Sequence, residues 1–567
     1  MNQYKKITIF VGLILLFVPF SVGAEYLDFN VDPSYDLLGR SKVSAFLHQV
    51  GERALFYVED DYYKTLRIED KKIFTLILKD LAKEFDEVIY PQLRELYGSE
   101  WKPGIDGEEK IYVLIARLKE GSAGYFNPAD EYPKAQVPAS TEREMVYLAA
   151  DHVLTDLASS YLAHEFVHLI TFNQKERNHG VTEEVWLNEG RAEISPALLG
   201  YDDKYQGSLL QKRVRAFVQN PDNPLTEWRE TAGDYGVVNL FFQYFLDHYK
   251  AQILTDSISS AKIGIPSLNE ALKKQGFIED FSQIFTNWTI AVLINDCRDN
   301  PQYCYWNENL KNLKVVPQLS YLPLAGESTL TFSDYTKNWT GNWFKLIGGK
   351  GTLKLEFDGE AKAKFKVVYV LHDYSDNYSI GFLGLDSSQN GQIEIPDFGA
   401  KYSSLTLIPT IQGKISGFNG LEDYYRFTWS ASIIDESSPK AEERLIQALL
   451  VQIEQLKSEI ARVQIQITAI LAARGGEVSC SRFENNLYFG ITNNQEVRCL
   501  QEFLKNQGED IYPEGLITGN FLALTQKAVV LFQEKYASDI LAPLGFEKGT
   551  GFVGPITRAK INELLGK

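Results

Sequence analysis

The chain has 567 residues, of which 44% are hydrophobic, 23% charged and 13% aromatic. This is the composition of a globular protein, and at roughly 100–200 residues per domain the length predicts about three to five folded units. It excludes collagen-like, low-complexity and mainly disordered chains. The net charge of −18 and the lack of a Lys/Arg-rich block argue against a nucleic-acid partner, because phosphate binding needs a basic face.

Residues 1–24 have the features of a secretory signal peptide. Two lysines precede an apolar run from position 7 to about 20, and Val22 and Ala24 are small residues placed as a cleavage site requires. An uncleaved membrane anchor is the alternative interpretation. The segment predicts export, and therefore a secreted or cell-surface location.

The four cysteines agree with export, because disulfides form in oxidising compartments. We expect the local pairs Cys297–Cys304 and Cys480–Cys499, since each pair falls within one predicted domain. A structural zinc site is the other interpretation, but the chain has no C-x-x-C motif and no histidine pair near the cysteines.

The strongest chemical signal is the H-E-x-x-H motif in YLAHEFVHLITF, residues 161–172. On a helix, His164 and His168 share one face, so both imidazoles can reach a single metal ion. Glu165 lies beside them, where its carboxylate can contact a water molecule next to that ion. Two histidines without a metal are the alternative, although the chain contains only seven His, which makes a chance motif rare.

A catalytic zinc needs a third protein ligand, and EVWLNEGRAEISPAL, residues 184–198, offers one. Glu189 follows His168 after enough chain for a turn and a returning helix. Glu193 lies four residues further, on the same helical face. It is placed to accept the free N–H of a ligand imidazole, which fixes the tautomer of that histidine.

These residues together resemble the gluzincin metallopeptidases, and within them the hyicolysin-type secreted endopeptidases. The segments AGYFNPADEYP (123–133) and REMVYLAAD (143–151) resemble those that precede the zinc helix in that family, and the second is expected to supply the edge strand beside the cleft. The resemblance covers about residues 100–250. It implies an α+β, zincin-like metallopeptidase domain over 25–320, Zn²⁺ as cofactor, and Glu189 as the third ligand.

The family chemistry assigns roles to two further groups. Zinc acidifies water and polarises the scissile carbonyl, while Glu165 takes the water proton and passes it to the leaving amine. The oxyanion needs another donor, and Tyr235, at the start of a helix that resembles one in the relatives, is the candidate. A packed core tyrosine is the alternative. The chain lacks the Gly-x-Met-Glu-Asn segment of aminopeptidases with this triad, which favours endopeptidase action.

Residues 326–434 show the period-two alternation of β-strands, as in GTLKLEF (351–357), with turn residues every 8–12 positions. The pattern predicts a small antiparallel β-sandwich. Its role is open between a spacer or stabilising module and a module that binds carbohydrate or substrate.

Residues 441–473 carry a heptad pattern with 3-4 spacing. Ile at the first apolar position and mostly Leu at the second favour a parallel two-stranded coiled coil, and hence a homodimer. One long helix packed on its own protein is the alternative. The apolar positions are Ile446, Leu449, Ile453, Leu456, Ile460, Val463, Ile467 and Ile470.

Residues 478–567 contain three segments with helical apolar spacing: VRCLQEFL, TQKAVVLFQEKY and ITRAKINELL. With the turns YPEGLITGNF and GTGFVGP between them, they resemble the peptidoglycan-binding domain family, which implies cell-wall peptidoglycan as a partner. The stretch Ala537–Thr550 is longer than the usual link, so a structural or protein-binding role stays open.

The sequence therefore predicts a multidomain, secreted zinc endopeptidase that hydrolyses proteins or peptides and is attached to the cell wall by its last domain. Two other hypotheses remain. One is a non-catalytic wall-binding adhesin built on a peptidase fold, and the other is a hydrolase of peptidoglycan crosslinks.

Overall fold

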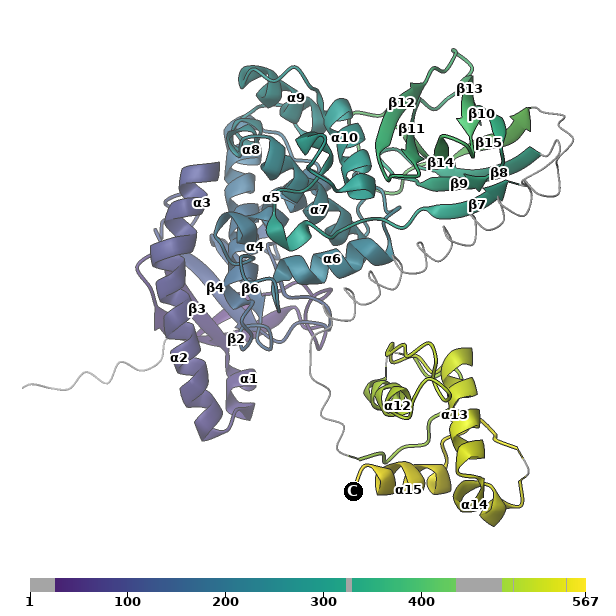
Figure 1. Ribbon diagram of the computed structural model, residues 1–567. Helices are drawn as coiled ribbons and strands as arrows, with labels where there is room; N and C mark the ends of the chain where they lie inside the picture. Colours follow the sequence, from purple (N-terminus) through teal and green to yellow (C-terminus); the bar gives the residue numbers. More distant parts are fainter. Residues whose placement is uncertain (1–25, 323–328, 435–481, 493, 547, 567) are drawn as a thin grey trace, which may run out of the picture. The chain divides into compact units, whose positions relative to one another are not determined.

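The computed structural model describes residues 26–322, 329–434, 482–492, 494–546 and 548–566 (Figure 1). The predicted signal peptide, the heptad segment 441–473 and Cys480 lie outside the described residues. The protein is a multidomain α+β chain that forms two compact units, one up to Pro439 and one from Lys440. Among the described residues, none of the helices combines the length and the apolar character needed to cross a bilayer.

The first unit starts with a six-stranded mixed sheet in the order β1-β2-β3-β4-β6-β5. Strands β3, β4 and β6 run parallel, whereas β1, β2 and β5 pair antiparallel with their neighbours. The strands are β1 (Tyr26–Asn30), β2 (Lys42–Val50), β3 (Ala54–Glu59), β4 (Ile111–Ala116), β5 (Gly124–Tyr125) and β6 (Met145–Ala149).

The expectation that residues 143–151 supply the edge strand is wrong. Strand β6 lies between β4 and β5, and the edge is the two-residue strand β5 from the preceding segment. All five residues of β6 are buried. Such a continuous apolar strand belongs in the interior of a sheet with both faces covered.

Successive residues of the strands serve two cores, as the period of two requires. Phe56, Val113 and Leu148 face the main core with the helices, whereas Leu114 and Tyr147 face a smaller core on the other side of the sheet. The helices that line the main core include α1 (Asp60–Thr65), α2 (Ile68–Glu84), α3 (Tyr90–Tyr97) and α4 (Ala158–Phe172), and Figure 1 shows α2 and α3 alongside the sheet.

Six further helices complete the helical part of this unit. They are α5 (Val185–Leu198), α6 (Leu209–Gln219), α7 (Ala232–His248), α8 (Gln252–Ile258), α9 (Gly264–Lys274) and α10 (Phe281–Ile294). Helix α7 starts with a capping box, in which Thr231 and Asp234 satisfy each other's backbone N–H groups. After α10, the predicted Cys297–Cys304 disulfide is confirmed. Cys499 is also disulfide-bonded.

Nine strands follow, mostly antiparallel, in two groups with the orders β12-β11-β14-β9-β7 and β13-β10-β15-β8. The β module joins the two groups through a single residue pair, Phe398 with Tyr402, and residues of both groups share one core. It also starts earlier than residue 326. The strands are β7 (Gln318–Leu322), β8 (Thr329–Thr336), β9 (Phe344–Gly348), β10 (Gly351–Gly359), β11 (Phe365–Asp373), β12 (Tyr378–Leu383), β13 (Asn390–Phe398), β14 (Tyr402–Ile411) and β15 (Tyr425–Ile434).

This β module has its own core but is also joined to the helical part. Trp339 and Trp343 are buried in the main core, and the Trp343 indole donates to the carbonyl of Thr289 in α10 at 2.9 Å. Lys337 reaches the buried carboxylate of Glu227 at 2.6 Å. The module therefore packs against the helices as part of one unit and is not a separate domain joined to them only by a linker.

The second unit contains the three predicted helices, α12 (Gln495–Asn506), α13 (Ala523–Lys535) and α15 (Pro555–Leu564), and a short α14 (Ala537–Ile540) within the long connection. One hydrogen-bond pattern occurs twice within this unit. Gln501 donates to the Thr525 hydroxyl at 2.8 Å and accepts from the backbone N–H of Gly519 at 2.8 Å. Gln533 makes the same two bonds with Thr557 and Gly551, at 3.0 and 2.9 Å.

Candidate metal centre

The H-E-x-x-H motif lies in the middle of α4, as the sequence predicts. The helix is buried almost all round, which is why it carries apolar residues on every side rather than on one stripe. His164, Glu165 and His168 are 8%, 5% and 7% exposed. Such burial of polar groups is costly unless they bind a partner.

Glu189 is carried by the next helix, α5, which packs on both α4 and α7. Gly190 allows the close approach to α7, because a Cβ atom at this position would overlap the ring of Phe242. The glycine that follows Glu189 therefore has a packing role, and it lets α5 lie close enough to present its carboxylate to the two histidines.

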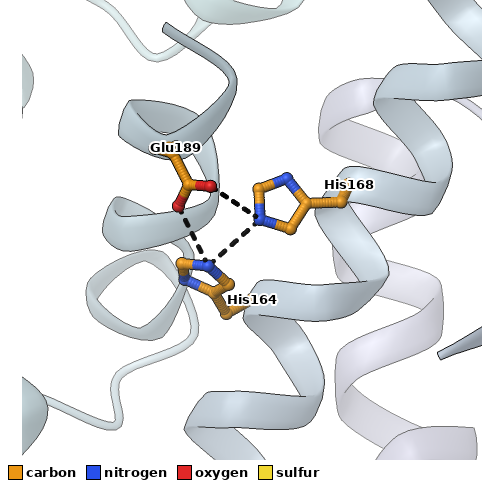
Figure 2. Close-up of side chains that lie close together, drawn as sticks. All are labelled: His164, His168 and Glu189. Carbon is orange, nitrogen blue, oxygen red and sulfur yellow. Dashed lines mark hydrogen bonds and ion pairs between the residues drawn. The ribbon is translucent and has the colours of Figure 1, made fainter. Parts of the chain in front are cut away.

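The three predicted ligands converge on one point (Figure 2). The Nε2 atoms of His164 and His168 are 3.1 Å apart. The two carboxylate oxygens of Glu189 lie 3.3 Å from His164 Nε2 and 3.6 Å from His168 Nε2. Among the described residues, this is the group of His, Cys, Asp and Glu side chains arranged to hold a metal ion.

The donor set fits a tetrahedral metal ion with one position left for another ligand. Two ligand atoms about 2.0–2.1 Å from a tetrahedral zinc lie about 3.3 Å apart, close to the three observed separations. Two imidazole nitrogens that face each other at 3.1 Å share at most one proton between them, so a cation between them satisfies both.

Glu193 lies behind the first histidine, in the supporting position that the sequence predicts. Its Oε1 atom is 3.3 Å from His164 Nδ1, and the side chain is fully buried. Burial opposes ionisation, but Arg213 and then His164 hold the pKa of Glu193 at about 2. The carboxylate is therefore ionised and fixes the orientation of the His164 ring.

Arg213 of α6 is the partner that sequence reasoning missed. Its guanidinium forms a two-pronged ion pair with Glu193, with both N–O distances at 2.6 Å. It also lies 4.5 Å from the centre of the Tyr235 ring. No spacing rule connects α6 with the motif, so only the fold reveals this contact.

The neighbouring groups of the cluster set the ionisation of its carboxyls. Burial opposes ionisation of Glu189, yet the neighbouring His168 and His164 lower the pKa of its carboxyl. For Glu165, burial outweighs the charge of His164 and raises the pKa of the carboxyl to about 8. Glu189 and Glu193 are therefore the ionised carboxylates of the cluster, and they lie on either side of His164.

Glu165 faces the edge strand of the sheet. A Cβ atom at Gly124 would lie 2.8 Å from Glu165 Oε1 and 2.7 Å from the carbonyl of Tyr147, so only glycine fits there. Strand β5 therefore passes directly beside the Glu165 carboxylate. The exposed edge of a strand is a surface on which an extended peptide can form backbone hydrogen bonds.

The carboxylates of this cluster contribute to raised phenol pKa values at two tyrosines. Tyr235 is in the first turn of α7, and burial and then the carboxylates of Glu189 and Glu193 raise the pKa of its phenol. Tyr35, which the sequence gave no role, stacks on Tyr125 of β5 with ring centres 4.5 Å apart. Burial and nearby carboxylates, Glu165 among them, raise the pKa of the Tyr35 phenol to about 12.

No protein-family model matches this sequence, and no curated protein matches it. Among solved structures, the M60 catalytic domain with the CBM51-1 and CBM51-2 domains of Clostridium perfringens ZmpB is similar over 68% of this chain and 59% of that one, with 8% identity and a TM-score of 0.24. The pre-peptidase C-terminal domain of collagenase from Bacillus anthracis is similar over 20% of this chain and 96% of that domain, with 12% identity and a TM-score of 0.14. Superpositions this weak carry no argument about function.

Proposed function

We propose that this chain is an exported zinc-dependent endopeptidase that hydrolyses peptide bonds of proteins. The observation that supports the proposal is the convergence of His164, His168 and Glu189 within 3.1–3.6 Å of one another, with Glu165 on the same helix turn. Three protein ligands with one open position are typical of a catalytic zinc rather than a structural one.

When bound there, zinc would acidify a water molecule and polarise the scissile carbonyl. Glu165 accepts the proton of the attacking water and delivers it to the leaving amine nitrogen.

The neighbouring side chains bind and orient. The substrate backbone lies along the edge strand β5, where the glycine at position 124 gives it access to Glu165. Tyr235 donates a hydrogen bond from its phenol O–H to the oxyanion. Arg213, stacked on the Tyr235 ring, keeps the ring in place while it pairs with Glu193.

We also propose that the second unit attaches the enzyme to cell-wall peptidoglycan. Tyr488, Phe489 and Phe552 are 53%, 54% and 40% exposed, and the Tyr488 and Phe552 rings lie 6.3 Å apart. Exposed aromatic groups of this kind mark interaction surfaces. Dimerisation through residues 441–473 remains a separate proposal.

The enzyme hypotheses can be distinguished by their products. The zinc-loaded protein is incubated with an unfolded protein and, separately, with purified peptidoglycan, with and without a chelator. We expect chelator-sensitive cleavage of internal peptide bonds in the unfolded protein and no soluble muropeptides. Release of muropeptides alone would favour the crosslink hydrolase, and a zinc-loaded protein inactive on both would favour the adhesin.

A further inference from the structure

A second feature of the catalytic unit lies outside the metal cluster: a pocket of about 380 Å³ with aromatic walls. Trp101, Tyr132 and Phe172 line it together with Ile105 and Pro133. Its polar lining groups are Glu131, Glu176 and Arg177. A pocket of this size accommodates a long side chain, and its walls suit an aliphatic stem.

Glu131 is the unusual member of this lining. It is 3% exposed, and among the described residues its buried carboxyl oxygens have no hydrogen-bond partner other than the carboxyl of Glu144. Its neighbour is a second buried carboxyl, Glu144, also 3% exposed. Burial and then Glu144 raise the pKa of Glu131 well above its usual value. Two adjacent buried carboxyls without donors are costly unless they share a proton or meet a cation.

The other charged groups at the pocket already have partners. Arg177 lies over the Trp101 ring, 3.1 Å from its centre, and Glu176 accepts a hydrogen bond from the Tyr132 hydroxyl at 3.1 Å. If Glu131 and Glu144 share one proton, the pair carries one negative charge, Glu176 a second, and Arg177 one positive charge. The pocket then carries one net negative charge, which one further positive charge would neutralise.

The pocket and the metal cluster are bordered by the same two segments. Phe172 lies on α4 one helical turn beyond His168, about 6 Å along the helix axis. The segment that starts at Gly124, against Glu165, continues to Phe126 and Tyr132. Both rings contact Phe172, with centres 6.0 and 5.8 Å away. One wall therefore runs from the reacting carboxylate to the pocket.

From this geometry we infer that the pocket is a specificity site for a basic side chain, lysine or arginine, of the peptide substrate. The ammonium or guanidinium group of that side chain binds to Glu131. The cation supplies the donors that the Glu131 oxygens lack, and the aromatic walls attract it through their ring faces. This inference rests on the proposed peptidase function, and it adds the substrate class.

The test compares matched peptides that carry lysine or norleucine at one position at a time, so that only the charge differs. We expect wild-type protein to cleave the lysine peptide at least about 10-fold faster, in kcat/KM, at one position near the scissile bond. In Glu131→Gln this lysine preference should fall about 10-fold, while cleavage of the norleucine peptide changes less than about 2-fold. Glu120→Gln, an exposed glutamate, is the matched control and keeps the wild-type preference.

A merely structural role of Glu131 would lower the rates on both peptides equally, and that result would overturn the inference, as would a wild type without a basic preference at any position. If the protein cleaves no peptide, the peptidase proposal fails, and the pocket is tested by binding. Nα-acetyl-lysine amide, but not Nα-acetyl-norleucine amide, should then bind wild type and not Glu131→Gln. Equal behaviour of the two amides would overturn the pocket assignment.

Discussion

The metal cluster and the Glu131 pocket both place glutamates out of water, but with opposite electrostatic results. Glu189 and Glu193 face histidines and Arg213, and the pKa of each carboxyl is lowered. Glu131 and Glu144 face each other, and the pKa of each is raised. Burial opposes ionisation in both places, so a buried carboxyl is held ionised only where a cationic partner outweighs burial. The first arrangement holds ionised ligands ready for a resident metal, and the second fits a cation that comes and goes with the substrate.

The largest expected effect is the loss of a ligand. Glu189→Ala removes one of three protein ligands, so zinc affinity should fall by more than the roughly 10–100-fold that outer groups contribute, and peptide hydrolysis should disappear with it. Zinc content by elemental analysis after dialysis checks this. Stoichiometric zinc in the variant would contradict the assignment of Glu189 as a ligand.

A smaller effect on zinc affinity is expected from the residues that support the ligand His164. Glu193→Gln removes the ionised partner of His164 Nδ1, and Arg213→Ala removes the cation that keeps Glu193 ionised. Each variant should bind zinc about 10–100-fold more weakly, as measured by competition with a metal indicator. Unchanged affinity in both variants would mean that the His164 ring is held by packing alone.

The buried carboxyls of Glu131 and Glu144 predict that the stability of the fold depends on pH. Burial raises the pKa of Glu144 from 4.5 to about 7. The folded chain therefore holds a proton that the unfolded chain has released, and rising pH across this window destabilises the wild type. The hydrogen bond with Glu131 and the charge of Arg177 favour its ionisation, whereas Glu100 and Asp106 oppose it.

Glu144→Gln has no proton to lose at this position. Its free energy of unfolding should fall less than that of wild type between pH 5 and pH 8, by up to about 3 kcal/mol, in urea titrations at both pH values. Parallel pH profiles for wild type and variant would show that the pair does not titrate in this range. Glu120→Gln again serves as the control.

The centre of the site could be predicted from the sequence because its geometry is local. Residues four apart on one helix must share a face, which fixes His164 against His168 and Glu189 against Glu193. Arg213 and the Glu131–Glu144 pair could not be predicted in this way. They are brought together by packing between elements, and neither spacing nor composition records that packing.

The fold shows the same limit. The three helices of the second unit follow from apolar periodicity, whereas α4, α5 and α7 are expected from the metal-binding motifs and the family resemblance. A two-residue strand such as β5 has no period, and the edge position of residues 143–151 is implied only by the family resemblance. The β module was also separated from the helices by its pattern, yet Trp339 and Trp343 place it in their core.

The most direct test of the central claim is Glu165→Gln, assayed for zinc content and peptide hydrolysis on the same sample. Gln keeps the shape of the side chain and all three ligands, so zinc should stay stoichiometric while kcat falls about 10²–10⁴-fold through the loss of proton transfer. Glu95→Gln, on the exposed side of α3, is the matched control and keeps full activity. Full activity of zinc-loaded Glu165→Gln would contradict the account.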